Sequence, residues 1–180
     1  MNSHQIDQIF NFLDTVNKSE KTFDDFSKWD EYTDRSSGKL RYVTAIQLNG
    51  ILGGGVSIRI TTPKETWEVD VYGQIEVRPP RMKRSLRVNP IEWRPLRPHV
   101  NSATAPSPYG LQQYFDRWHP YDLNKPLGIG AFDQSDKGVA TPLPRAISSF
   151  SEYLELCSEI WKCPDVKGIP TPPWSPQLTF

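Results

Sequence analysis

The hydrophobic positions of the chain repeat with a period of two through its centre and with a helical period near both ends. Between residues 39 and 93, apolar side chains alternate with polar ones, as at Val56, Ile58 and Ile60. The longest alternating run places five apolar side chains on one face: Trp67, Val69, Val71, Ile75 and Val77. Such alternation is typical of strands that bury one face of a sheet. Short connections between successive runs favour antiparallel pairing of neighbouring strands. The central segment therefore predicts an antiparallel β-meander of about four or five strands.

Two amphipathic helices flank this sheet in the sequence. The first, over residues 1–17, has Ser3 as its expected N-cap. Its apolar residues fall at helical spacing: Ile6, Ile9, Phe10 and Leu13. The second, over residues 149–163, begins at a capping box formed by Ser149 and Glu152. We expect both helices to pack on one face of the sheet, which predicts an α+β fold.

The remaining segments show neither period clearly. Residues 18–34 fit either a helix or one strand of a hairpin, and the pattern does not decide between them. Residues 94–146 are rich in proline and glycine and predict a long irregular cover. Residues 164–180 form a proline-rich tail, which we expect to be extended and fastened to the domain by Trp174. A length of 180 residues suits a single domain over 1–180 and is too short for two ordinary ones.

Composition and charge exclude several classes of protein. The chain is 37% hydrophobic and 12% aromatic, which excludes a disordered, solvating protein. Its 21 basic and 21 acidic residues cancel, so it has no global field of one sign. No apolar run is long enough to span a bilayer, and the N-terminus does not resemble a secretory signal. Two cysteines, Cys157 and Cys163, are too few for a disulfide scaffold. Cys157 falls on the apolar stripe of the second helix and Cys163 at its C-terminus, so we expect neither to be a good nucleophile. We therefore expect a reduced, cytoplasmic protein that does not enter membranes.

The strongest local charge feature lies between residues 78 and 97. One acid, Glu92, and the aromatic Trp93 lie there among seven basic residues: Arg78, Arg81, Lys83, Arg84, Arg87, Arg94 and Arg97. Cations beside an aromatic side chain are what binding to a phosphate backbone needs. Alternatively, Arg84 and Arg87 pair across a hairpin with acids of the preceding strand and leave only the turn residues free.

A second candidate site lies in the irregular segment. His99 and His119 both occur there, and Asp116 and Asp122 are each three residues from His119. Two histidines and a carboxylate can form a metal site or an acid–base pair if the fold brings them together. The histidines can equally well serve only to bond backbone carbonyls, and the sequence does not show whether they meet.

These observations favour a protein that binds rather than one that catalyses a reaction, with no cofactor. The most concrete hypothesis is an interaction or inhibitor protein of a bacterial or mobile-element system. Its basic hairpin, with Trp93 nearby, would engage nucleic acid or an acidic protein surface. The alternative is a small metal-dependent nuclease or hydrolase that uses His99 and His119 with Asp116 or Asp122.

Overall fold

The computed structural model describes residues 2–34, 37–80, 82–133 and 138–175. Its helices are α1 (Ser3–Lys18), α2 (Tyr121–Asn124) and α3 (Phe150–Trp161), with short 3₁₀ helices at Lys125–Leu127, Ile129–Phe132 and Pro164–Gly168. Its strands are β1 (Lys21–Phe23), β2 (Asp30–Asp34), β3 (Ser37–Leu48), β4 (Ile51–Pro63), β5 (Val71–Val77), β6 (Leu86–Trp93), β7 (His99–Val100), β8 (Gln113–Tyr114), β9 (Arg117–Trp118) and β10 (Thr141–Pro142).

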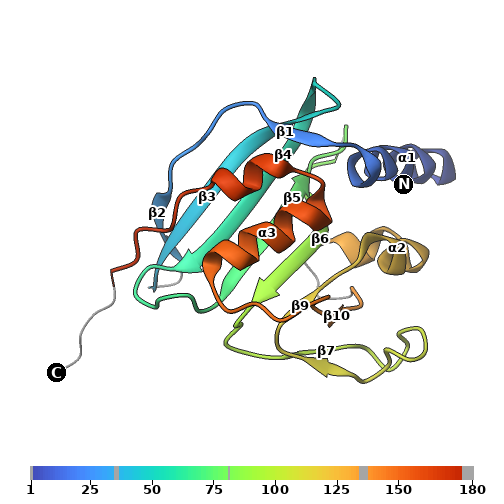
Figure 1. The fold of residues 1–180 in the computed structure, drawn as a ribbon. Coiled ribbons are helices and arrows are strands. Elements are labelled where there is room, and N and C mark those ends of the chain that lie inside the picture. The colour runs from blue at the N-terminus through green and yellow to red at the C-terminus, as the bar shows by residue number, and fades with distance from the viewer. Residues whose placement is uncertain (1, 35–36, 81, 134–137, 176–180) are drawn as a thin grey trace.

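Eight of the described strands form one sheet (Figure 1). Its order is β1-β3-β4-β5-β6-β9-β10, with β2 also paired to β3, and every pair is antiparallel. The fold is α+β. The sheet has more strands than the four or five predicted, because β1, β2, β9 and β10 are only two to five residues long. Segments of that length are too short to show a period in the sequence.

The stretch between α1 and β3 forms strands rather than a helix. Strand β2 pairs with β3 as a hairpin in which Asp30 lies opposite Arg41. Just before β2, the ring of Trp29 lies 5.6 Å from that of Tyr42 and 6.2 Å from that of Phe150. Trp29 thus anchors this edge of the sheet to the core.

The two faces of the sheet differ in polarity. Val56, Ile58 and Ile60 of β4 are all buried, whereas the residues between them are only partly covered. Helix α3 lies across the apolar face (Figure 1). The same core receives three buried side chains from α1: Ile9, Leu13 and Val16. The alternation therefore leaves the opposite face for polar side chains.

Side-chain caps define where both long helices begin. The N-cap of α1 is Asn2 rather than Ser3, since Asn2 Oδ1 accepts from the backbone N–H of Gln5 at 2.9 Å and Gln5 Oε1 accepts from that of Asn2. The N-cap of α3 is Ser149, whose Oγ accepts from the backbone N–H of Glu152 at 3.3 Å. No helix in the described ranges is long and apolar enough to cross a membrane.

The long alternating run before residue 78 forms a strand only over its second half. Glu68 and Asp70 adopt positive φ angles of 51° and 53°, a left-handed backbone that interrupts an extended strand. Strand β5 consequently begins at Val71. Trp67, which the alternation placed on the core face, lies outside the sheet and is exposed.

Residues 94–146, predicted to be an irregular cover, contain four short strands and α2. Two buried amide side chains hold this segment together. Asn101 donates from Nδ2 to the carbonyl of Ala140 at 2.9 Å and accepts from its N–H at 2.8 Å. Asn124 makes the same pair of bonds with Val139. These side chains form hydrogen bonds with buried backbone groups that have no partner on a neighbouring strand.

Trp174 fastens the proline-rich tail to the domain, as expected. Its ring lies 5.2 Å from that of Trp67 and 5.5 Å from that of Phe150. Its indole N–H donates to Thr62 Oγ1 at 3.3 Å. The partly exposed Trp67 and the tail therefore pack against each other at one end of the sheet.

Gly73 of β5 marks the point where α3 comes closest to the sheet. A Cβ atom at this position would lie 2.4 Å from Tyr153 Oη and 2.8 Å from the Trp161 ring. Both of these side chains are fully buried, so neither can move away freely.

We therefore predict that Gly73→Ala lowers the free energy of unfolding by about 2–3 kcal/mol, the cost of forcing an extra methyl group into a packed core. Gly54→Ala is the matched control, because a Cβ there meets nothing within 4 Å. Urea denaturation of both variants measures the difference. Equal stabilities would show that the core at Gly73 adjusts freely.

Candidate functional site

The sheet face opposite α3 carries a row of polar side chains. The strand register places one residue from each of five neighbouring strands side by side: Arg41, Thr61, Tyr72, Glu92 and Arg117. The sequence neighbours of these residues point to the other face, because side chains alternate along a strand. The part of the row around Tyr72 and Glu92 borders a pocket whose other lining residues include His119, Asn124 and Phe132.

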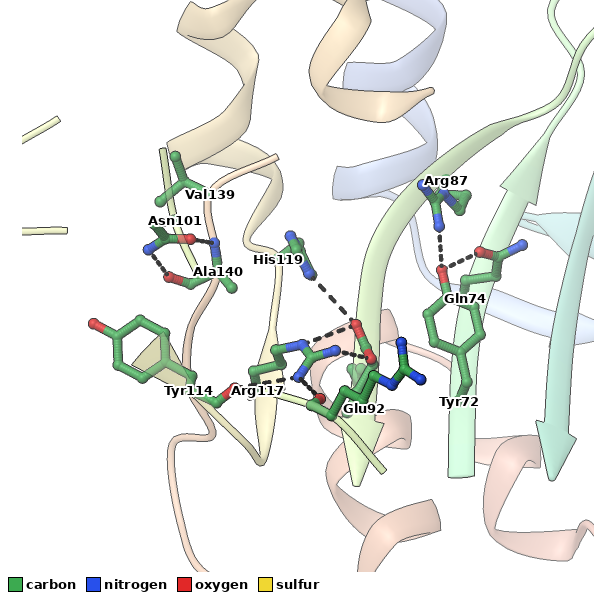
Figure 2. A network of polar contacts seen from close by, with 12 residues as sticks. Tyr72, Gln74, Arg87, Glu92, Asn101, Tyr114, Arg117, His119, Val139 and Ala140 are labelled. Atoms are coloured by element: carbon green, nitrogen blue, oxygen red, sulfur yellow. Dashed lines mark hydrogen bonds and ion pairs between the residues drawn. The ribbon is translucent and has the colours of Figure 1, made fainter. Parts of the chain in front are cut away.

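A buried ion pair ends this row (Figure 2). Glu92 Oε1 accepts from Arg117 Nε at 3.0 Å, and Oε2 accepts from Nη2. The remaining nitrogen, Nη1, donates to the backbone carbonyls of Arg97, Tyr114 and Phe115. Arg117 is only 7% exposed. One guanidinium therefore links the sheet to the polypeptide segment that leaves it after β6.

The structure brings His99 and His119 together beside this ion pair. Their ring centroids are 5.1 Å apart in an edge-to-face arrangement. His119 Nε2 lies 3.6 Å from Glu92 Oε1, and its backbone N–H donates to the carbonyl of Pro90. Burial by itself would raise the pKa of Glu92, but the contact with His119 and the charge of Arg117 outweigh it and lower that pKa. Glu92 is therefore an ionised carboxylate next to His119.

Neither predicted aspartate lies in this position. Asp116 Oδ1 accepts from the backbone N–H of Arg94 at 2.7 Å, and Asp122 is exposed on α2. Within the described residues, no group of three or more His, Cys, Asp or Glu side chains is close enough to hold a metal ion. The alternation of β6 places Glu92 on the polar face, but only the fold brings it to His119.

A small polar pocket adjoins the histidines. Tyr72 Oη donates to Gln74 Oε1 at 2.7 Å and accepts from Arg87 Nη1 at 3.1 Å (Figure 2). Arg87 Nη2 donates to the carbonyl of Asp133 at 2.7 Å. Burial raises the pKa of Tyr72 to about 12, so this hydroxyl stays protonated. The pocket between this group and His119 measures about 30 Å³, room for about two water molecules.

The predicted basic residues are divided between the two ends of β6. The connection between β5 and β6 carries Arg78, Lys83 and Arg84, all exposed. The Arg84 guanidinium lies 3.7 Å from an Asp133 oxygen, and its side chain is 78% exposed. No acidic partner of Arg78 or Lys83 is found among the residues that the structure describes. Arg81 lies outside those residues.

The other end of β6 has a structural role. Trp93 is fully buried and stacks on Tyr153 with a centroid distance of 5.9 Å, so its ring is not available to a nucleic-acid base. The Arg94 guanidinium lies 4.5 Å from the centroid of the Trp93 ring and also contacts Glu68. Arg97 is exposed. Eight residues of strand separate these side chains from the hairpin connection, roughly 25 Å along the strand.

The two cysteines are unsuited to nucleophilic chemistry, as the sequence indicated. Both are buried free thiols. Burial raises the pKa of Cys163 to about 12, and it raises the pKa of Cys157 further above the ordinary value. The thiolate form is therefore negligible at neutral pH.

We predict that Arg117→Met lowers the free energy of unfolding by about 3–5 kcal/mol, because it leaves Glu92 charged and buried without its partner. Arg145→Met is the matched control, since Arg145 forms a comparable ion pair with Glu159 at the surface. An exposed pair contributes at most about 1 kcal/mol. If urea denaturation shows the same loss of unfolding free energy for both variants, the buried pair contributes no more to stability than the exposed pair.

Comparison with known proteins identified no relative whose function could be assigned to this chain. No protein-family model, no curated protein and no solved structure matches the chain. The function is therefore argued from the arrangement of its own side chains.

Proposed function

We propose that the protein binds a polyanionic surface, of nucleic acid or of an acidic protein, through the connection between β5 and β6, without converting a substrate. The observation that supports this proposal most directly is the state of Arg78, Lys83 and Arg84. These three cations project from one short connection that closes a hairpin, where Val77 lies opposite Leu86. Their side chains are exposed and largely free of acidic partners.

The contrast with the other cations strengthens the argument. Within the described part of the chain, ion pairs to an acid are seen for nine Lys or Arg side chains, eight of them outside this connection. The chain as a whole has no net charge. A group of unneutralised cations on such a protein creates a local positive field, which attracts phosphate or carboxylate groups. We name Arg78, Lys83 and Arg84 the basic end of the hairpin.

The remaining parts of the hypothesis extend this proposal. Two free thiols suit a reducing compartment such as the cytoplasm. An inhibitor role in a bacterial or mobile-element system would follow if the polyanionic surface belongs to a nucleic-acid-processing enzyme or to its substrate. Either role requires the basic end to remain accessible, and its exposure in the structure is compatible with that.

We predict that Arg78→Glu combined with Lys83→Glu weakens binding to labelled single- or double-stranded DNA or RNA by about tenfold or more at low salt. The dependence of log K on log salt should become shallower by about 2, because each lost phosphate contact removes about one unit of slope. Lys28→Glu combined with Lys167→Glu makes the same charge change at two other exposed lysines. Fluorescence anisotropy at several salt concentrations measures all three proteins.

The same titration with labelled polyglutamate distinguishes a nucleic-acid surface from an acidic protein surface. Binding to nucleic acid alone identifies phosphate as the ligand, and binding to polyglutamate alone identifies an acidic protein. If neither probe binds, or if the control pair weakens binding as much as the hairpin pair, the proposal is rejected.

One observation favours hydrolysis as a second candidate function. His99 and His119 lie together, and an ionised carboxylate is beside His119, although it is Glu92 and not Asp116 or Asp122. In this arrangement Glu92 orients His119, and His119 can accept a proton from a water molecule in the adjoining pocket. A further hollow of about 230 Å³ shares Tyr72 and Glu92 with that pocket and offers space for part of a substrate.

If this second function is correct, labelled nucleic acid incubated with Mg²⁺ or Mn²⁺ should yield shortened products. His119→Ala should then abolish them. His4→Ala should not, because His4 lies on α1 and its ring contacts only Gln8 of the same helix among the bonds observed. Intact probes with the wild-type protein, or products that persist in His119→Ala, would exclude this site as a nuclease.

A further inference from the structure

Residues 170–175 of the proline-rich tail lie against three aromatic side chains that come from separate parts of the chain. Trp29 precedes β2, Trp67 lies between β4 and β5, and Phe150 begins α3. Each of them contacts the tail, which runs past β2 in Figure 1. The ring of Trp29 also lies 6.2 Å from that of Phe150. We name these three residues the aromatic seat.

Hydrogen bonds fix the tail in the aromatic seat at two points. The indole N–H of Trp29 donates to the carbonyl of Pro170 at 2.7 Å. The backbone N–H of Ser175 donates to the carbonyl of Lys64 at 2.9 Å. Between these two bonds, the ring of Trp174 packs on the seat. Aromatic-lined sites are a recurring means by which proteins recognise proline-rich segments, because such segments are already extended before they bind.

The side chains that the seat covers define what it recognises. Pro172 and Trp174 are buried, whereas Thr171, Pro173 and Ser175 are exposed. Three of the six residues from 170 to 175 are proline. The fixed φ angle of proline reduces the conformational freedom that binding removes. The seat therefore suits a short proline-rich segment that has a proline two positions before an aromatic anchor.

Few contacts hold the tail in place. Within the described part of the chain, residues 170–175 belong to no helix or strand. Trp174 is their single large apolar side chain. Burial of one such side chain shifts an equilibrium by roughly tenfold to a hundredfold. Segments held by so few contacts open locally, at a much lower free energy than the whole domain. We therefore expect a minority of molecules to have an empty seat.

We propose that the aromatic seat is a binding site for a proline-rich segment of another protein, and that the tail occupies it as an internal competitor. The partner segment carries a proline two positions before an aromatic residue, as the tail does, and offers a carbonyl to the indole of Trp29. It binds molecules whose seat is empty, so the tail reduces its apparent affinity by the fraction of such molecules. The inference does not depend on what the basic end of the hairpin binds.

The first test measures whether the tail opens by itself. Native-state hydrogen exchange of the wild-type protein should give the N–H of Ser175 a protection factor of roughly 10–100, set by local opening. The N–H of Ile58, in the central strand β4, should be protected far more strongly, because it opens only when the sheet unfolds. Equal protection of the two amides would overturn the proposal, since the tail would then leave only with global unfolding.

The second test measures binding of a separate segment. The probe is a labelled peptide with the sequence of residues 168–180, and fluorescence anisotropy measures its binding to the full chain. Trp174→Ala in the protein removes the anchor of the internal competitor, so this variant should bind the peptide roughly tenfold to a hundredfold more tightly than the wild type does. A peptide with the same tryptophan replaced by alanine is the control and should bind at least tenfold more weakly. Urea denaturation checks that the variant is folded.

A further substitution locates the bound peptide. Trp29→Phe, added to Trp174→Ala, keeps a ring in the seat but removes the indole N–H that donates to the carbonyl of Pro170. It should weaken peptide binding by about fivefold, the effect of one lost hydrogen bond. Trp118→Phe in the same background is the matched control, because Trp118 lies in β9, which does not contribute to the seat.

Three outcomes of these measurements overturn the proposal. If the peptide does not bind the folded Trp174→Ala variant, the seat serves only to hold the tail. If Trp29→Phe and Trp118→Phe change the affinity equally, the peptide binds elsewhere. If sedimentation shows a wild-type dimer that Trp174→Ala abolishes, the occupant is the tail of a second copy and not a segment of another protein.

Discussion

The buried ion pair between Glu92 and Arg117 is the interaction on which the polar half of the structure depends. Two charges removed from water are stable together only if each finds enough partners. Glu92 receives two bonds from Arg117, and the third nitrogen of Arg117 binds three backbone carbonyls. This pair consequently holds the two-stranded sheet of β7 and β8 in position, and it places an ionised carboxylate beside His119.

The two faces of the sheet carry different kinds of side chain. The apolar face receives α3 so closely that Gly73 has no room for a side chain. The other face carries charged and hydroxyl side chains in register across five strands. Because alternate residues of one strand serve both faces, the stability of the core and the geometry of the polar row are linked. The basic end of the hairpin precedes β6, whereas Glu92 lies near the other end of the same strand.

Part of this structure could be predicted from local patterns. Period-two alternation identified the long strands, and Ser149 with Glu152 marked the start of α3, because both signals depend on residues close together in the chain. The strands of two or three residues were missed, since segments of that length show no period, and residues 30–34 were left open between a helix and a hairpin strand. The start of β5 was also missed, because the left-handed backbone of Glu68 and Asp70 leaves no mark in an alternating sequence.

The sequence by itself determined the α+β class, the cluster of cations before β6 and the inert character of the cysteines. These follow from composition, spacing and helix periodicity, which are properties of neighbouring residues. Only the tertiary structure decided which side chains meet. Trp93 joined the core instead of the surface, and Glu92 replaced the aspartates beside the histidines. Glu92 and Arg117 are 25 positions apart, and contacts over such distances depend on the irregular path between them, which no repeating pattern encodes.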